Sequence, residues 1–385
     1  LTTTQSVRAP RCIGAAYAGP VRSPRDLDDF ISLPWRVYRG DRCWVPPLIP
    51  RQKELLDRSR HPFHRHAEVE YFLASQDGQV VGRVAAILNH RHNEFHHENI
   101  GFFGFFECVE SPQVAAALLQ AAGAWLKERG AVAMRGPASF SSNEEWGLLI
   151  EGFERPPTIM MSYNPRYYAG LLEGAGLAKI KDLVAWRSRL ETANKTQLRR
   201  LTDRLTRSGD ITVRPINMKR FNEEVKLLHE LYNKAWSLNW GFVPMTEEEF
   251  FHMARQLKDL VLPDIILVGY VKGEPAGFSL SLLDYNQAFI HMNGRIGLLE
   301  IIKFLWHSRR IRFTRAVAMG VAPAYQRKGL DALLMFESFS RAMRKGITEG
   351  EISWVLEDNM RMNNTCVSLG LKVYKRYRVY ERALS

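Results

Sequence analysis

The chain has 385 residues, a net charge of +12 and a pI near 9.6. A hydrophobic content of 46% and a charged content of 24% are typical of a globular protein and exclude a disordered or fibrous one. Such a length predicts two domains, and the basic balance favours an acidic partner such as a phosphorylated cofactor or an anionic lipid headgroup. Nucleic acid is not expected as a partner, because the bases are scattered along the chain and accompany no nucleic-acid-binding motif.

The cysteines and the N-terminus indicate the compartment. Residues 1–20 are predicted to be a flexible arm and not a secretory signal, because they hold no sustained apolar segment. No stretch reaches the ~18 apolar residues of a transmembrane helix. The cysteines are far apart, which argues against a disulfide framework or a zinc ribbon and favours the cytoplasm; they are Cys12, Cys43, Cys108 and Cys366.

The first half is predicted to alternate strands and helices. Residues 26–47 combine a short amphipathic helix with a loop rich in proline and tryptophan. A hairpin over 71–88 turns at Asp77-Gly78, a pair of residues typical of tight turns. Further elements follow in the order strand, helix, strand, helix and strand, at residues 99–110, 113–130, 131–139, 165–176 and 179–190.

The second half repeats this order after a polar helical linker at 191–210. It is predicted to hold a strand, two helices, a second hairpin that turns at Lys272-Gly273, and an amphipathic segment. A strand, a long helix, a strand, a short helix and a last strand follow. In chain order, the predicted ranges of all the elements of this half are 211–217, 221–236, 246–260, 265–283, 298–312, 312–321, 330–345, 351–358, 360–370 and 373–384. A repeat of roughly 190 residues predicts a duplicated α/β domain with a mixed sheet.

A basic turn lies between the strand and the long helix of the second half. In VAPAYQRKGLDALL, Arg327, Lys328 and Gly329 directly precede an apolar helix. The N-terminus of a helix presents unpaired backbone N–H groups, and glycine lets a ligand approach the backbone closely. The turn therefore predicts a phosphate site, although an ordinary solvated turn has the same composition.

Two motifs in this half resemble the GCN5-related N-acetyltransferase (GNAT) superfamily. They are V-x-P-x-Y-Q-R-K-G-L, from Val321, and N-x(6)-C-V-S-L-G-L, from Asn359. The resemblance covers about residues 211–385 and implies a domain that binds acyl-CoA without a metal. Asp331 departs from the motif, which has a small residue there. The resemblance implies donor contacts from Met319, Gly320, Val321, Gln326, Arg327, Lys328, Gly329, Leu330, Asp331 and Asn359.

Residues 21–190 show the same order of elements without a glycine or a basic turn at the corresponding helix. This half therefore resembles a degenerate GNAT domain that shapes the acceptor side. The segment 140–168 is similar to a bacterial group of tandem GNAT proteins, some of which resemble bacterial ceramide synthases. The resemblance implies an N-acyltransferase that acts on an amine, with a lipid-like sphingoid amine as the narrower expectation. A small-molecule or peptide acetyltransferase and a non-catalytic acyl-CoA-binding protein are the alternatives.

The resemblance also indicates where the proton transfers would occur. Many relatives have a tyrosine as the thiolate acid at the position of Cys366, and a thiol is a poor substitute; Tyr374 on the last strand is the alternative candidate. The candidate bases are Glu357 and Asp358 on the donor side and Glu144, Glu145 and His97 on the acceptor side, of which Glu357 and Glu145 are preferred. The acceptor contacts are predicted to be His97, Glu107, Asn143, Tyr163 and Asn164.

Three further segments have two interpretations each. The histidine-rich residues 89–99 could hold a metal, but a solvated loop is the simpler interpretation. The run GFFGFFE, from Gly101, is either plain core or the wall of an acyl or acceptor tunnel. The apolar and basic residues of 301–312 suit a helix on an anionic membrane surface, while a helix packed at the domain interface is the simpler interpretation.

Overall fold

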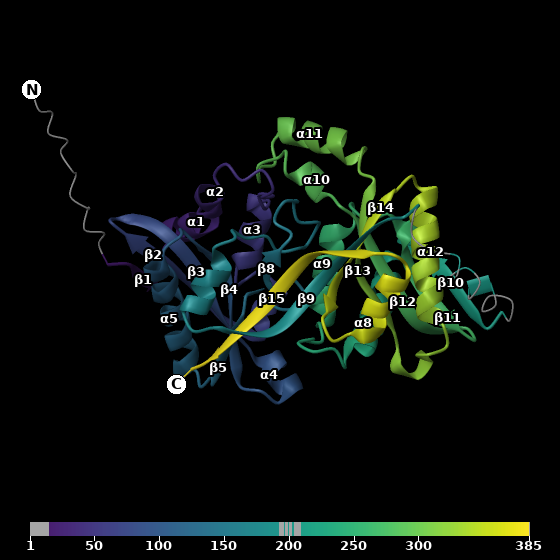
Figure 1. Ribbon diagram of the computed structural model, residues 1–385, viewed down its shortest axis with the longest axis horizontal. Coiled ribbons are helices and arrows are strands. Elements are labelled where there is room, and N and C mark those ends of the chain that lie inside the picture. Colours follow the sequence, from purple (N-terminus) through teal and green to yellow (C-terminus); the bar gives the residue numbers. More distant parts are fainter. Residues whose placement is uncertain (1–14, 192–195, 197–198, 200–201, 204–208, 385) are drawn as a thin grey trace, which may run out of the picture.

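One continuous mixed sheet runs through the molecule (Figure 1). The computed structural model describes residues 15–191, 196, 199, 202–203 and 209–384. The strand order is β1-β2-β3-β4-β5-β15-β9-β14-β13-β12-β11-β10, with β8 paired to β15. The strands of this sheet are β1 (Tyr17–Pro20), β2 (Ala67–Gln76), β3 (Gln79–Asn89), β4 (Ile100–Cys108), β5 (Ala133–Gly136), β8 (Leu148–Glu151), β9 (Ala178–Arg189), β10 (Ile211–Pro215), β11 (Ile266–Val271), β12 (Glu274–Leu283), β13 (Phe313–Val321), β14 (Glu349–Leu356) and β15 (Lys372–Ala383).

Helices cover the sheet, and a small ribbon of β6 (Ala138–Ser139) and β7 (Glu145–Trp146) lies beside it. The helices of the first half are α1 (Pro24–Ser32), α2 (Pro34–Val37), α3 (Ile49–Leu56), α4 (His90–His96), α5 (Pro112–Glu128) and α6 (Tyr168–Gly174). Those of the second half are α8 (Phe221–Trp236), α9 (Glu247–Leu257), α10 (Asn286–Phe289), α11 (Leu298–Ser308), α12 (Leu330–Arg344) and α13 (Met360–Ser368). Short 3₁₀ turns are η1 (Pro62–Arg65), η2 (Met218–Arg220), η3 (Pro263–Ile265) and η4 (Pro323–Tyr325).

The predicted repeat is visible in the pairing of the strands. In the first half, the hairpin β2–β3 is followed by β4, which α5 connects to the parallel strand β5. In the second half, the hairpin β11–β12 is followed by β13, which α12 connects to the parallel strand β14. Both hairpins turn where predicted, with positive φ at Asp77-Gly78 and at Lys272-Gly273. The mixed α/β architecture predicted from sequence is confirmed.

The two halves exchange their last strands. The final strand of the second half, β15, pairs with β5, β8 and β9, all of which belong to the first half. Conversely β9 pairs with β14 of the second half. In Figure 1, β15 crosses the molecule diagonally and ends in the first half. Two half-sheets joined in this way cannot separate without breaking backbone hydrogen bonds, so a rigid connection between the halves follows.

The N-terminal segment corrects one expectation. Residues 17–20, predicted to belong to a flexible arm, form β1 and pair with β2. Without β1, the outer edge of β2 would present backbone N–H and C=O groups that have no hydrogen-bond partner, and β1 supplies these partners. Residues 1–14 and most of the predicted linker 191–210 lie outside the described residues, and the domain limits stay a prediction.

The GFFGFFE run is buried on both faces of β4. Phe103 and Phe106 pack with α5 on one face, and Phe102 and Phe105 belong to the core on the other face. All four side chains are buried. Adjacent strand residues point to opposite faces, so a strand with phenylalanines on both must be covered on both sides.

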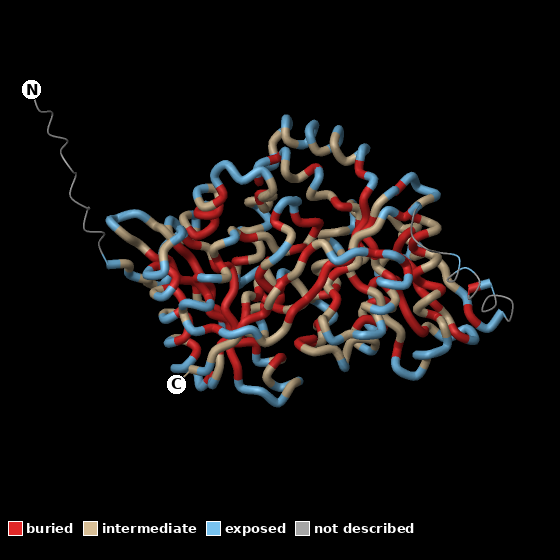
Figure 2. Tube along the Cα trace, viewed as in Figure 1, coloured by how far each residue is buried: buried red, intermediate tan, exposed pale blue. Residues whose placement is uncertain are grey.

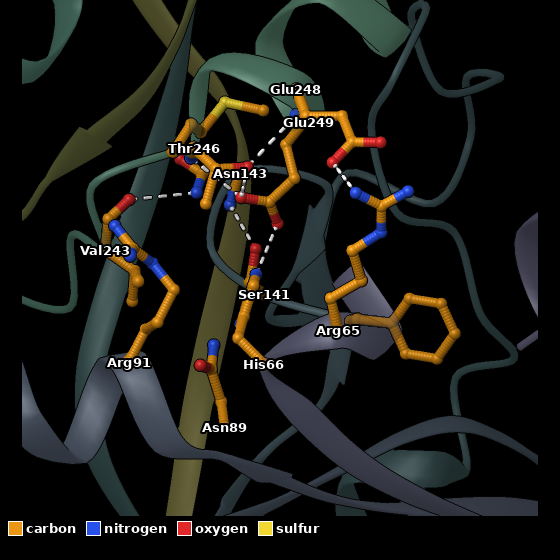
Figure 3. A network of polar contacts seen from close by, with 12 residues as sticks. Arg65, His66, Asn89, Arg91, Ser141, Asn143, Val243, Thr246, Glu248 and Glu249 are labelled. Carbon is orange, nitrogen blue, oxygen red and sulfur yellow. Dashed lines mark hydrogen bonds and ion pairs between the residues drawn. The ribbon is translucent and has the colours of Figure 1, made fainter. Parts of the chain in front are cut away.

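Polar side chains also connect the first half to the second (Figure 3). The His66 imidazole contacts the Glu249 carboxylate at 2.9 Å, and Arg65 pairs with Glu248. Asn143 donates to the carbonyl of Val243 at 3.0 Å. The first two contacts hold residues 65–66 against the start of α9, and the third holds the loop at residues 139–147 against the segment before α9.

Candidate active site

The basic turn forms the wall of a cavity of about 690 Å³ at the start of α12. Gly329 is the N-cap with a φ of +86°, a left-handed conformation that suits glycine, and Arg327 before it has a φ of +63°. The helix begins directly after Gly329, so the N–H groups of its first turn point out of the helix end toward this cavity. Together with Arg327 and Lys328, these N–H groups give the cavity the character of an anion site.

The predicted donor residues lie together around this cavity, with one exception. Leu330 is fully buried and packs against Gly269 under the sheet, so its side chain supports α12 and does not face the cavity. The cavity is lined by the other predicted donor residues, namely Met319, Gly320, Val321, Gln326, Arg327, Lys328, Gly329, Asp331 and Asn359.

Asp331 does not present a free carboxylate to the anion site. Its Oδ2 pairs with the Arg361 guanidinium at 2.6 Å, and Arg361 lines the same cavity from α13. The carboxylate that departs from the GNAT motif is therefore paired with a guanidinium thirty residues along the chain. Sequence alone could not pair the two residues, since each lies at the first turn of a different helix.

We expect Arg361→Ala to weaken acyl-CoA binding about tenfold, because it removes one positive charge and leaves Asp331 unpaired beside the phosphates. Asp331→Ala combined with Arg361→Ala should restore part of this loss. Isothermal titration with CoA on the two single variants and the double variant measures the coupling. Purely additive effects would contradict the compensation.

The sheet forks next to the anion site. β13 and β14 pair in parallel only from Phe313 with Glu349 to Ala316 with Ile352. Beyond this point β13 continues to Val321 beside β12, while β14, which pairs with β9 along its other edge from Glu349 on, no longer pairs with β13. The backbone of β13 past Ala316 therefore faces an opening instead of a strand. A strand edge of this kind can pair with an extended ligand through its backbone groups.

A mostly apolar cavity of about 210 Å³ fills this fork. It adjoins the anion site, because Trp236, Met319 and Met335 line both. It continues into the core of the second half between the sheet and the helices α8, α9 and α12. The apolar side chains that line its interior include Leu228, Phe250, Met253, Leu257, Ile265, Phe278 and Phe339.

A third cavity of about 430 Å³ opens between the halves. It adjoins the fork cavity, because both are lined by Asn143, Glu144 and Met245. Anion site, fork cavity and this inter-half cavity therefore form one connected series. Four of the predicted acceptor contacts, Glu107, Asn143, Tyr163 and Asn164, line the inter-half cavity, and His97 does not.

Glu144 lies where the fork cavity meets the inter-half cavity. About a quarter of its side chain is accessible, and protein surrounds the rest. Burial raises the pKa of Glu144 to about 8, and the carboxylates of Glu249 and Glu145 act in the same direction, whereas the backbone N–H of Phe140 lowers it. The His61 ring nitrogen lies 3.8 Å from its carboxylate. Burial also lowers the pKa of His61 to about 4, so this imidazole is neutral at physiological pH.

Glu145, the preferred base in the sequence analysis, lines the inter-half cavity only. Burial raises its pKa, and the charge of Arg83 opposes the rise. By accessible surface Glu145 is exposed, whereas Glu144 is half-buried. Of the two neighbouring carboxylates, Glu144 alone faces both cavities.

Glu107 is a second, largely enclosed acid in the inter-half cavity, with 13% of its side chain exposed. Tyr168 and Tyr38 donate to its carboxylate at 2.7 and 3.2 Å, and Arg83 lies 3.9 Å away. Burial raises the pKa of Glu107 to about 7, although Arg83 and the two hydroxyls oppose this. The cluster can hold a polar headgroup or an ammonium group.

The amides of Asn143 and Asn164 are already occupied by the protein. Tyr232 donates to Asn143 at 2.6 Å, and Asn164 bonds both the N–H and the carbonyl of Leu149. Tyr163 donates to Asp41 at 2.9 Å. These residues shape the inter-half cavity and keep its walls in place.

The structure places several predicted proton carriers away from the three cavities. Glu357 pairs with Lys179 at 2.8 Å and accepts from the backbone N–H of Asp182, and Asp358 pairs with Lys181 at 2.6 Å. His97 is exposed at the end of α4. These ion pairs give Glu357 and Asp358 a structural role. The geometry therefore does not support Glu357 as the preferred base.

Of the two candidates for the thiolate acid, Cys366 is buried and Tyr374 is half-buried. Cys366 packs in the core under α13, where burial raises the pKa of its thiol to about 12. Tyr374 donates to the buried carboxylate of Glu351. Burial and the Glu351 charge raise the pKa of this tyrosine. Neither residue lines the three cavities.

Glu351 is a site residue that sequence reasoning missed. It lies on β14 at the root of the fork, lines the fork cavity and is buried. Thr158 donates to its carboxylate at 2.9 Å, and the buried Arg315 of β13 lies 3.8 Å away. The available sequence signal was a charged residue in the strand EISW, where polar and apolar residues alternate. Burying a carboxylate costs free energy unless the carboxylate is paired, so a charged residue there indicates a partner.

The histidine-rich segment forms α4 and connects the halves. His96 contacts the carbonyl of Phe242 at 2.7 Å, and His92 contacts Glu98 at 3.0 Å. Among the described residues, no group of three histidine, cysteine, aspartate or glutamate side chains is arranged to hold a metal ion. Independence from metals stays a prediction.

This chain has a sheet that forks beside a glycine-started helix and a second half that repeats the fold, which is the tandem GNAT fold. It belongs to one family with two curated bacterial proteins. It is 38% identical over 379 residues to Protein YghO of Escherichia coli (strain K12), with 96% of each chain covered. It is 34% identical over 372 residues to the bacterial ceramide synthase of Caulobacter vibrioides, with 95% of this chain and 97% of that chain covered.

Comparison with solved structures supports the fold. A tandem GNAT protein from the clavulanic acid biosynthesis pathway superimposes with a TM-score of 0.56 at 12% identity, covering 96% of this chain and 99% of that chain. No family model matches the chain. In the described part of the chain, no helix has the length and apolar content that crossing a bilayer requires.

Proposed function

We propose that this protein transfers an acyl chain from acyl-CoA to the primary amine of a lipid-like acceptor of the sphingoid type. The observation that carries the proposal is the series of three adjoining cavities: an anion site, an apolar fork and a mostly apolar inter-half cavity with buried acids. The name of one relative, bacterial ceramide synthase, supports the choice of acceptor, because a ceramide is an N-acylated sphingoid amine.

The anion site suits the pyrophosphate of CoA. Arg327, Lys328 and the first turn of α12 supply the positive charge, and the free edge of β13 suits an extended pantetheine arm. The acyl chain would then occupy the fork cavity, whose walls are apolar. The matching helix of the first half, α5, begins at Ser111, whose hydroxyl caps the backbone N–H of Val114. A capped helix end without glycine offers no second donor site.

Glu144 is the general base in this proposal. An acceptor amine is protonated at neutral pH and cannot attack a carbonyl until it loses a proton. A carboxyl group with a pKa of about 8 can take that proton where the two cavities meet. The neutral amine then attacks the thioester carbonyl, and as the C–S bond breaks and the amide forms, the nitrogen releases its second proton to solvent. CoA leaves as the thiolate and takes up a proton from solvent, because Cys366 and Tyr374 do not face the cavities.

The inter-half cavity would hold the acceptor. Its apolar wall includes Trp44, Leu48, Phe105, Phe106 and Phe289. Phe105 and Phe106 come from GFFGFFE, so this run contributes both to the core and to the cavity wall. The cluster around Glu107 supplies the polar end.

We expect long-chain sphingoid amines to be much better acceptors than short amino alcohols. Each buried CH₂ contributes ~0.8 kcal/mol, so an acceptor without ten methylenes should have a kcat/KM that is lower by several orders of magnitude. The measurement compares kcat/KM for a long-chain sphingoid amine and a short water-soluble amino alcohol with one acyl-CoA. Equal use of the short amine would support a small-molecule or peptide acetyltransferase instead.

The proposal includes a cytoplasmic location with peripheral contact to the inner membrane face. What supports it is the unpaired state of the described cysteines Cys43, Cys108 and Cys366, together with the basic balance of the chain. A lipid-like amine resides in a bilayer, so the enzyme has to meet a membrane surface to reach it.

A further inference from the structure

The helix α11 exposes its apolar face to solvent. No residue of α11 is buried, and Figure 2 shows it as an exposed and half-buried helix at the edge of the molecule. Six large apolar side chains are between 42% and 77% exposed: Leu298, Leu299, Ile301, Ile302, Leu305 and Trp306. An exposed apolar patch of this kind marks an interaction surface. We call these six residues the α11 face.

The orientation of the helix is fixed by its other side. The Phe304 ring stacks on Phe289 of α10 with 5.4 Å between ring centroids, and the His307 ring stacks on His291 at 3.7 Å. At 3.6 residues per turn, the α11 face covers about 160° of the circumference on the side away from these contacts. Packing at a domain interface, the simpler expectation from sequence, is therefore wrong: the apolar side of α11 faces outward.

Basic side chains surround the α11 face. Lys303, Arg309 and Arg310 are exposed on the helix or at its end, and Arg310 lies over the Trp306 ring at 3.4 Å. Arg295 and Arg312 flank the segment, in which Glu300 is the one acid. None of these five basic residues forms an ion pair with a described residue. Apolar residues with unpaired bases beside them are the pattern of a helix that lies in an anionic lipid surface.

The α11 face lies next to the inter-half cavity. Asn286 and Phe289 of α10, the helix on which α11 packs, line that cavity. The segment between the two helices is tied to the opposite rim, because the carbonyl of Gly294 accepts from the N–H of Ile49 at 2.8 Å and Asn293 accepts from Trp35 at 3.0 Å. In Figure 1, α10 and α11 project together from the upper edge, where the two halves meet.

We propose that the α11 face inserts into the surface of an anionic bilayer and holds the inter-half cavity against it. An acceptor amine could then move from the bilayer along Phe289 into the cavity without crossing water. The docking itself stands on the exposed face and its charges; only the delivery of an acceptor rests on the proposed function. Charge complementarity favours an anionic bilayer over a second copy of this chain, which carries the same net charge of +12.

The test is sedimentation with vesicles in the absence of donor and acceptor. The full chain should bind vesicles of phosphatidylcholine with 30% phosphatidylglycerol in roughly tenfold preference to pure phosphatidylcholine vesicles, and 0.5 M NaCl should weaken the binding. Ile302→Glu with Leu305→Glu should reduce the binding at least tenfold. The matched control is Val132→Glu with Leu238→Glu, which places the same two charges at other exposed apolar residues and should leave the binding unchanged.

Further readouts separate the possible outcomes. Circular dichroism and melting curves establish that the double variant is folded. We expect it to fold because no residue of α11 is buried. Unchanged vesicle binding by the folded double variant would overturn the proposal. So would a parent dimer that fails to bind vesicles and becomes monomeric on the double substitution, since a second copy would then cover the face. Because no acyl transfer is measured, failure of the proposed function would leave this result unaffected.

Discussion

Gly329→Val is expected to abolish acyl-CoA binding, with a loss of at least roughly 100-fold in affinity, or about 3 kcal/mol. Gly329 has a φ of +86° at the N-cap of α12, where a β-branched side chain is strained and would stand in front of the first-turn N–H groups. Isothermal titration with CoA measures the loss. Parent-like affinity would show that the phosphates bind elsewhere.

Gly273→Val is the matched control for backbone strain. Gly273 has a φ of +83° in the turn between β11 and β12, and an added Cβ there would have open space. The substitution should lower the melting temperature, because a left-handed conformation costs an ordinary residue about 1–2 kcal/mol. It should leave the affinity for CoA unchanged. Loss of binding in both variants would attribute the effect of Gly329→Val to the fold.

Glu144→Gln is expected to lower kcat by about 10² to 10⁴ and to leave the affinity for acyl-CoA unchanged. The carboxylate form is the base, so kcat/KM of the parent should rise with pH and level off above about 8. The variant should lose this dependence. Glu145→Gln is the matched control: it removes a neighbouring carboxylate that lines the inter-half cavity alone. The reverse ranking of the two variants would assign the base to Glu145.

The stability of the Glu144→Gln variant supplies a readout that is independent of activity. Burial raises the folded-state pKa of Glu144 from an ordinary 4.5 to about 8, so the folded protein holds this proton more tightly than the unfolded chain. The free energy of unfolding of the parent therefore falls as pH rises from about 4.5 to 8. Glutamine does not titrate, so the stability advantage of the variant should increase across this window. A constant difference would contradict the raised pKa.

The donor side of this protein could be predicted from sequence because its residues are close together in the chain. Gln326 to Gly329 form one turn, and the physical requirement for glycine at a helix start is local. Both hairpin turns, Asp77-Gly78 and Lys272-Gly273, were predictable for the same reason. Local backbone geometry is encoded in adjacent residues.

The acceptor side depends on residues that are distant in sequence. Glu144 has its unusual pKa because β7 and the loop before it pack against the second half, with Glu249 more than a hundred residues away. Glu351 is likewise buried against the distant Thr158 and Arg315. The exchange of β9 and β15 produces this arrangement. The residue pattern of neither strand predicts which strand it will pair with. On the donor side, the Asp331–Arg361 ion pair across two helices is a contact of this kind.

The outward orientation of α11 also could not be derived from its sequence. Its amphipathic pattern is that of any helix packed on a core, with the apolar side inward. Only the contacts of Phe304 and His307 show which side faces the protein. The same pattern thus permitted two opposite orientations, and tertiary packing selected one.

The most direct test of the central claim is product analysis by mass spectrometry. The purified protein is incubated with a long-chain acyl-CoA and a long-chain sphingoid amine, and the amide and the free CoA thiol are quantified together. The account predicts one N-acylated amine for each thiol released, with both products reduced to background by Gly329→Val. Tight binding of acyl-CoA without amide formation would contradict it and identify a non-catalytic acyl-CoA-binding protein.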